Sequence, residues 1–144
     1  MKTIKSLLGT LLILALFMTT AGVAQEGHYY TVTTWKIQIP QDGSRAELND
    51  LMKEFSEKVV LKNEKILSEK VMHHISGADL RDLVITTEYA NWNDIDAAST
   101  RQAELMETAW PSEDERKNFL KTWNKYVITH SDEIYQEMPE LAKK

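Results

Sequence analysis

The sequence of 144 residues contains no cysteine. This absence excludes disulfide bonds, metal sites with thiolate ligands, a cysteine nucleophile and a lipid-modified cysteine. The four histidines do not form any of the metal-binding patterns H-x-E, H-x-H or H-E-x-x-H. There is also no internal repeat and no low-complexity segment. The domain must therefore be stabilised by its hydrophobic core, and association with a second copy would help a domain of this size.

Long hydrophobic runs are missing except at the N-terminus. The segment MKTIK-SLLGTLLILALFM-TTAGVA, residues 1–24, has two lysines, then an uncharged apolar stretch, then small residues. This order is typical of a secretory signal peptide, and we place the cleavage after Ala24. An uncleaved membrane anchor is the alternative, although Ser6 to Ala24 barely reaches the roughly 20 residues that span a bilayer. We expect residues 25–144 to form a single secreted or periplasmic domain.

Basic residues are outnumbered in the chain that remains after cleavage. Removal of Lys2 and Lys5 leaves 15 basic residues against 22 acidic residues, which gives a formal charge of −7. An acidic chain repels phosphate backbones and anionic lipid headgroups. Nucleic acid and membrane surfaces are therefore not expected partners of the cleaved protein.

The residues that are present alternate between strand-like and helix-like patterns. Runs rich in β-branched and aromatic residues predict strands. Apolar residues at helical spacing after S-x-x-E sequences or an asparagine predict helices. The expected elements are a strand over 29–39, a helix capped by Ser44 and Glu47, strands over 70–76 and 83–90, a helix over 93–108 capped by Asn93, a helix capped by Ser112 and Glu115, and a strand over 131–138.

This order predicts an α+β fold of the ferredoxin-like type, β-α-β-β-α(α)-β. Right-handed connections place the first and third strands in the middle of a four-stranded antiparallel sheet, with the helices on one face. The other face is left bare and needs a cover. We expect a second copy of the chain to provide it.

The chain resembles the dimeric α/β-barrel superfamily, which includes proteins similar to antibiotic-biosynthesis monooxygenases. The resemblance rests on the element order, on the hairpin HHISGADLRDLVITTEY, on Trp92-Asn93-Asp94 after the third strand and on the closing HSDEIY. It implies a homodimer in which two sheets pack face to face and enclose a barrel. Members include cofactor-independent monooxygenases, haem-degrading enzymes, isomerases and proteins without known activity, so the fold does not select the function.

The hairpin determines which polar residues share the bare face. If Ser76 lies opposite Val84, His74 and Glu88 lie on one face while apolar residues fill the other. The first and last strands sort in the same way, with Trp35 and Ile134 toward the helices. The residues expected on the bare face, and hence in the barrel interior, are Thr34, Lys36, His74, Thr86, Glu88 and Tyr135.

Two roles are open for these residues. His74 and Glu88 are the candidate catalytic pair, because a carboxylate can orient an imidazole for proton abstraction. Thr34, Lys36, Thr86 and Tyr135 are the candidate ligand-binding residues, together with Trp92 at the rim. Alternatively, Glu88 only neutralises Lys36 or His74 at a dimer contact.

A metal site formed by His74, Glu88 and His130 is a further alternative, since imidazole and carboxylate suit zinc or iron. No spacing motif supports it, and His130 is expected at a helix end, so we expect neither a metal nor a cofactor. Two functions remain. In the first, the protein is a homodimer without catalytic activity, which binds a small apolar or aromatic molecule or has a structural role. In the second, it is a cofactor-independent enzyme resembling a monooxygenase or isomerase. The sequence leaves open whether the protein is an enzyme.

Overall fold

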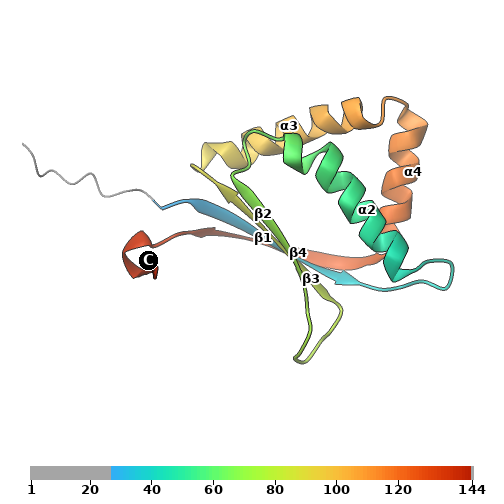
Figure 1. Ribbon diagram of the computed structural model, residues 1–144, viewed down its shortest axis with the longest axis horizontal. Coiled ribbons are helices and arrows are strands. Elements are labelled where there is room, and N and C mark those ends of the chain that lie inside the picture. Colours follow the sequence, from blue (N-terminus) through green and yellow to red (C-terminus); the bar gives the residue numbers. More distant parts are fainter. Residues whose placement is uncertain (1–26, 144) are drawn as a thin grey trace, which may run out of the picture.

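The computed structural model describes residues 27–143 (Figure 1). The predicted signal peptide, residues 1–24, lies outside the described residues. Within them, no helix is both long and apolar enough to cross a membrane. The elements in chain order are β1 (Tyr29–Ile37), α2 (Arg45–Lys58), η1 (Val60–Lys62), β2 (Ser68–His73), β3 (Asp82–Tyr89), α3 (Asn93–Ala109), α4 (Glu113–Asn124), β4 (Val127–Gln136) and η2 (Pro139–Leu141).

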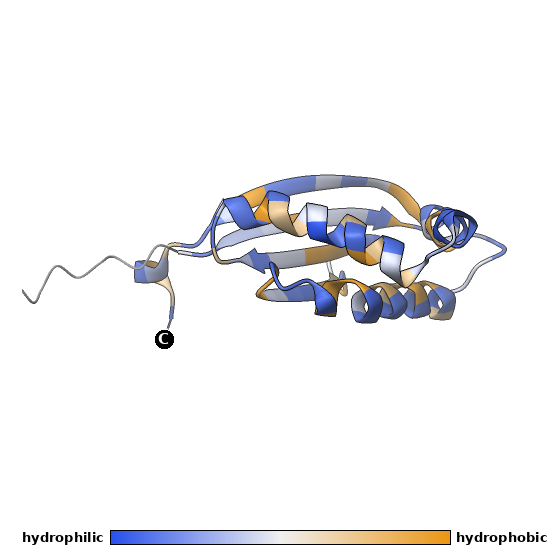
Figure 2. Ribbon diagram, turned by 90° about the horizontal axis from the view of Figure 1, so that it is seen from above, coloured by the Kyte–Doolittle hydropathy of each residue, from blue (hydrophilic) through white to orange (hydrophobic). Residues whose placement is uncertain are grey.

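The four strands form one antiparallel sheet in the order β2-β3-β1-β4. The first and third strands are therefore central, as predicted, and the arrangement is the ferredoxin-like α+β fold. Figure 1 shows α3 and α4 meeting at a corner, with α2 running from the lower end of α4 toward the middle of α3. In Figure 2 each helix carries both hydrophilic and hydrophobic residues, as expected for helices with one buried side.

The boundaries of all four strands differ from the prediction; β2 spans Ser68–His73 instead of 70–76, and β3 is shifted by one residue. β1 ends at Ile37, two residues early, after an irregularity in its pairing with β4 at Lys36 and Ile37. β4 begins at Val127, four residues early, because Val127, Ile128 and Thr129 are β-branched and favour extended backbone. The prediction that His130 lies at a helix end is consequently wrong, since it lies within β4.

The helix starts use their caps in different ways. Ser112 and Glu115 form the predicted capping box at α4. At α2 the Ser44 side chain accepts a hydrogen bond from the backbone N–H of Glu47 at 3.0 Å, but the Glu47 carboxylate turns to Tyr126 and Lys125 instead. The hydroxyl of Tyr126 accepts the hydrogen bond from the Ser44 N–H at 3.1 Å. The start of α2 is thus tied to the residue that precedes β4.

The cap predicted at Asn93 lies two residues earlier. Trp92 occupies the N-cap position of α3 and makes no side-chain capping bond. The side-chain oxygen of Asn91 instead accepts a hydrogen bond from the backbone N–H of Asp94 at 3.2 Å. Asparagine suits either position, so the pattern around Trp92 did not distinguish them.

The core consists of two buried clusters. One joins the sheet to α2 through Ile37, Leu48, Leu83 and Tyr126. The other lies among the helices and contains Val59, Leu105, Trp110 and Phe119. Tyr126 is fully buried, and so is Leu48 at 1% exposure. The first cluster thus joins the helix layer to the sheet, and the second joins the helices to one another.

The β2–β3 hairpin extends beyond the body of the molecule (Figure 1). Met72, not Ser76, lies opposite Val84, so the predicted register is wrong by four residues. An even shift preserves which side chains share a face, and the predicted separation of faces is confirmed. The longer loop is closed by Lys36, whose ammonium group pairs with Asp79 at 3.1 Å and also with Asp82.

Candidate functional site

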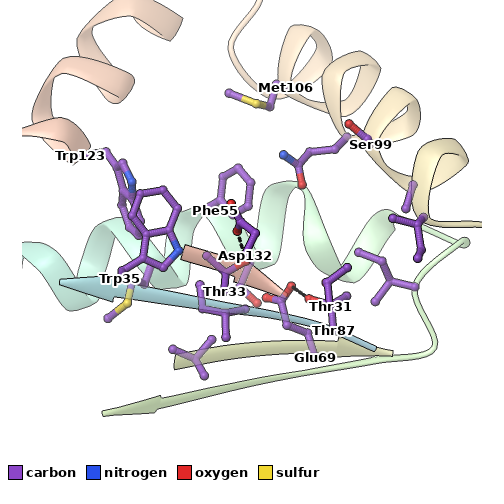
Figure 3. Close-up of a pocket in the computed structure, with 18 of the residues that line it drawn as sticks. Thr31, Thr33, Trp35, Phe55, Glu69, Thr87, Ser99, Met106, Trp123 and Asp132 are labelled. Atoms are coloured by element: carbon purple, nitrogen blue, oxygen red, sulfur yellow. Dashed lines mark hydrogen bonds between the residues drawn. The ribbon is translucent and has the colours of Figure 1, made fainter. Parts of the chain in front are cut away.

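A cavity of about 420 Å³ lies between the sheet and the helices (Figure 3). Strands β1, β2, β3 and β4 form its floor, and α2, α3 and α4 form its walls. Large apolar or aromatic residues cover most of its surface. These are Trp35, Met52, Phe55, Ile66, Val71, Ile85, Tyr89, Ile95, Met106, Phe119, Leu120 and Trp123. The space is therefore a pocket suited to an apolar molecule.

Small side chains on both sides create this space. The sheet presents Thr31, Thr33 and Thr87 to the helices, and α3 presents Ala98 and Ser99 above them. The cavity is open to solvent at its rim, where Val71 is 48% and Leu120 is 42% exposed. It is therefore a cleft that a small molecule can enter from outside.

Glu69 is the acidic group in the cavity whose environment is most apolar. It lies on β2 opposite Thr87, and the Thr87 hydroxyl donates a hydrogen bond to its Oε2 at 3.0 Å. Within the described residues its other oxygen, Oε1, has no hydrogen-bond partner. Burial raises the pKa of the Glu69 carboxyl, and the hydrogen bond from Thr87 only partly offsets this. A carboxyl with a raised pKa in an apolar pocket can act as a proton donor or acceptor.

A second acidic group, Asp132, lies at the β4 edge of the cavity. The Thr33 hydroxyl donates a hydrogen bond to Asp132 Oδ1 at 2.8 Å (Figure 3). The imidazole of His130 lies 3.1 Å from Asp132 Oδ2 and stacks on Trp35 at 4.6 Å between ring centres. Trp35 also meets Trp123 edge to face at 5.7 Å. This edge of the cavity thus combines a paired carboxylate with aromatic walls.

The residues predicted for the bare face do share that face, which points away from the helices. Strand pairing places them together: Thr34, Lys36, Thr86, Glu88 and Tyr135 lie on the strands, and His74 directly follows β2. None of them lines the cavity described above. A chamber on their side requires a second chain, and their binding role stays a prediction.

The candidate catalytic pair, His74 and Glu88, does not form within one chain. The backbone N–H of His74 bonds to Asp82, and Glu88 lies six residues farther along β3, roughly 20 Å away at the usual rise per residue. His74 Nε2 lies 2.5 Å from the carbonyl oxygen of Ser76, and its Nδ1 lies 3.8 Å from Asp82. Their catalytic role stays a prediction that a second chain would have to complete.

Glu88 pairs with groups that the sequence did not suggest. Its Oε1 lies 2.6 Å from His28 Nδ1, and its Oε2 accepts a hydrogen bond from Ser68. Hydrogen bonds from Ser68, His28 and Tyr30 lower the pKa of the Glu88 carboxyl. Within one chain Glu88 therefore does not pair with Lys36, whose ammonium group is held by Asp79 and Asp82. The alternative that Glu88 neutralises Lys36 or His74 at a dimer contact stays a prediction.

The other candidate residues are placed as follows. Tyr135 is 55% exposed on the bare face. Trp92 is also 55% exposed and meets Tyr29 edge to face at 5.8 Å, outside the cavity lining. His130 faces the helices, whereas His74 and Glu88 lie on the bare face, so the three do not converge on one metal. Within residues 27–143 no group of three or more His, Asp or Glu residues could hold a metal ion.

Sequence reasoning missed Glu69 and Asp132. The predicted second strand began at residue 70, so Glu69 fell outside it. Side chains two residues apart on a strand share a face, so a strand that began two residues earlier would have placed Glu69 on the helix side with Val71. Asp132 stands two residues before Ile134, which was already assigned to the helix side, so the same alternation predicts its position.

No protein-family model matches the sequence, and no curated protein is significantly similar to it. Solved structures are similar in fold. They include a mutant of SnoaB, a cofactor-independent oxygenase from Streptomyces nogalater (7% identity, TM-score 0.54, 81% of this chain and 99% of that chain). A putative antibiotic biosynthesis monooxygenase from Caulobacter crescentus has 14% identity and a TM-score of 0.52, with 79% and 92% covered.

An uncharacterized NIPSNAP domain protein from Burkholderia xenovorans is also similar, at 11% identity and a TM-score of 0.51, with 80% of this chain and 99% of that chain covered. At these identities the likeness concerns the fold alone. It confirms the architectural resemblance expected from the element order.

Proposed function

We propose that this protein binds a small, largely apolar or aromatic molecule in the cavity between its sheet and its helices. One observation carries the proposal. A space of about 420 Å³, within the usual range for small-molecule sites, opens between the sheet and the helices, where threonine, alanine and serine side chains leave room between large apolar residues. The polar groups Glu69 and Asp132 are each held by a threonine hydroxyl, which fixes their orientation toward such a ligand.

Filling the cavity tests this proposal. Ala98 is buried and lines the cavity, so Ala98→Leu places three further carbon atoms in the binding space. We expect 2-naphthol, a small neutral aromatic probe, to bind the natural protein and to bind Ala98→Leu about tenfold more weakly or not at all in calorimetry. Ala103→Leu on the exposed side of α3 is the matched control. Absence of 2-naphthol binding to the natural protein, or equal binding to Ala98→Leu, would contradict the proposal.

A second copy of the chain is the proposed partner. The bare sheet face exposes Tyr135 and Met72, and a face of this size is poorly suited to remain in water. Face-to-face packing would also enclose Thr34, Thr86 and Glu88 in the barrel interior that the sequence predicts. We propose this homodimer as the functional form.

A catalytic role is the second candidate, and the raised pKa of Glu69 favours it. Glu69 could accept a proton from a carbon or hydroxyl of the bound molecule. In an isomerase the proton returns at another position. In a cofactor-independent oxygenase, such as the Streptomyces protein of similar fold, the deprotonated substrate would supply all the electrons to dioxygen. One oxygen atom would remain on the substrate and the other would leave as water.

Oxygen uptake in the presence of candidate enolic or phenolic substrates tests this role. Glu69→Gln should abolish turnover while the protein still binds 2-naphthol, because the amide keeps the shape but cannot take a proton. Glu88→Gln and His74→Ala test the pair on the bare face in the same assay. If those variants lose turnover as intact dimers and Glu69→Gln does not, the reaction belongs to the barrel interior.

We also propose that the domain is exported and cleaved after Ala24. The charge pattern, apolar stretch and small residues of the first 24 positions support this proposal. The mass of the protein recovered from its host tests it, since cleavage leaves a chain that begins at Gln25.

A further inference from the structure

We propose that the molecule bound in this cavity is a cation, namely a protonated or quaternary amine that carries an apolar or aromatic group. This inference rests on the proposed function and specifies its ligand class. It begins from the charges that face the cavity. Glu69 and Asp132 are the two carboxylates of the lining, and in the described residues no lysine, arginine or histidine lines the cavity.

The absence of a basic lining residue separates ligand classes. A carboxylate, phosphate or sulfonate would enter a largely apolar space beside the half-buried Glu69, where no basic side chain among the described lining residues compensates its charge. Asp132 adds less to this repulsion, because its side chain is 60% exposed and lies beside His130. An ammonium group would instead be attracted by the carboxylate groups of the lining and repelled by none of the side chains that the structure describes there. Charge complementarity of this kind contributes to selection among ligands of one shape.

Aromatic rings give a second and independent reason. Five of the lining residues are aromatic: Trp35, Phe55, Tyr89, Phe119 and Trp123. The faces of such rings carry partial negative charge and attract ammonium groups, tryptophan most strongly. The same rings provide the apolar surface that would cover the rest of the ligand.

Within the cavity, Glu69 is better placed than Asp132 to receive the ammonium group. Asp132 already has a hydroxyl donor on one oxygen and the imidazole of His130 on the other. Glu69 has only Thr87, and its Oε1 is without a hydrogen-bond partner in the described residues. Partial burial of a carboxylate without a counter-charge is costly, and a bound ammonium group would supply that charge. The structure therefore orients the ligand with its nitrogen toward β2.

Three probes of similar shape and different charge test this inference. They are 2-phenylethylamine, which is a cation near neutral pH, 2-phenylethanol, which is neutral, and 3-phenylpropanoate, which is an anion. We expect the amine to bind about tenfold more tightly than the alcohol in calorimetry with the full-length natural protein, and the anion to bind most weakly. Equal or tighter binding of the alcohol or the anion would overturn the inference and leave the proposed apolar site intact. Failure of all three probes and of 2-naphthol would overturn the proposed function as well.

Variants then locate the charge that selects the amine. Glu69→Gln should reduce the affinity for 2-phenylethylamine about tenfold and leave that for 2-phenylethanol nearly unchanged. Glu107→Gln, at an exposed acidic position of α3 that does not line the cavity, should change neither affinity. If Glu69→Gln keeps the preference for the amine, Glu69 is not the receiving group and the inference is wrong. Retention of 2-phenylethanol binding shows that the variant is folded.

Discussion

Glu69 and Glu88 lie on neighbouring strands of one sheet, and their surroundings shift the pKa values of the two carboxyls in opposite directions. Glu69 points toward the helices, where burial raises its pKa. Glu88 points to the bare face, where Ser68, His28 and Tyr30 hydrogen-bond to the carboxylate and lower its pKa. The difference follows from the alternation of side chains along β2 and β3. At the residue scale, a change of face decides in which direction the pKa of a glutamate moves.

The raised pKa of Glu69 predicts a pH-dependent effect of Glu69→Gln on stability. Because the folded state holds the proton more tightly than the unfolded state, this group stabilises the fold below its ordinary pKa of 4.5. That contribution is lost as the pH rises through the raised value, and glutamine does not titrate. We expect Glu69→Gln to be more stable than the natural protein at about pH 7.5 and equally stable at about pH 4.

Urea unfolding at the two pH values measures this difference, provided that the slope of the transition is the same for both proteins. Glu107→Gln, at an exposed position of α3 outside the cavity, is the control and should show no such divergence. If the natural protein is instead more stable than Glu69→Gln at the higher pH, the prediction is contradicted. The Glu69 carboxylate would then not be destabilised by burial in the folded state.

At the scale of elements, the β2–β3 hairpin shows that a longer loop can change the pairing register of two strands while the same side chains stay on each face of the sheet. The loop after His74 is held by Lys36 through Asp79 and Asp82, and Arg81 also pairs with Asp79 at 2.8 Å. These contacts with β1 and within the loop are tertiary or local ionic effects that no alternation of apolar residues encodes. The loop can therefore grow by an even number of residues while the same side chains stay buried.

Gly77 is the position in this loop where the backbone requires glycine. Its φ of +144° is rarely adopted by residues with a side chain, and a Cβ there would meet the imidazole of His74. We expect Gly77→Ala to lower the free energy of unfolding by about 1 kcal/mol or more. Ser76→Ala, at the preceding exposed position, should change it by less than about 0.5 kcal/mol. Chemical denaturation compares the two, and equal effects would show that the loop adjusts its backbone.

At the scale of the whole molecule, the sheet has two faces with different tasks. One face and the helices enclose the cavity, and the other is bare. A single row of paired residues crosses the bare face from Lys70 through Thr86 and Val32 to Glu133. The row begins with a basic residue at one edge and ends with an acidic residue at the other. A twofold axis along the strands would therefore place Lys70 of one copy over Glu133 of the next.

This arrangement predicts a charge-reversal rescue. Lys70→Glu or Glu133→Lys alone should weaken the dimer, because each places like charges together, and the double variant should restore it. Sedimentation velocity over a range of concentrations measures the association. A natural protein that stays monomeric at the highest concentration reached would refute the dimer. Weakening without rescue would refute this orientation of the two copies.

The sequence was sufficient for the local features and insufficient for the site. The cap at Ser112 followed from short-range spacing, and the strand order followed from element order and handedness. Glu69 was missed because a strand boundary uncertain by two residues removed it from the pattern. The pairing of Glu88 with His28 joins residues 60 positions apart, and no local signal indicates it.

Alternation and helical spacing, which depend on near neighbours in the chain, determined the fold class, the central strands and the residues that share each face. Tertiary structure alone decided where the space lies. Whether the threonines on β1 and β3 and the small residues on α3 leave a cavity depends on how far the helix layer stands from the sheet. That distance is fixed by side chains such as Tyr126 and Phe119, which come from distant parts of the chain.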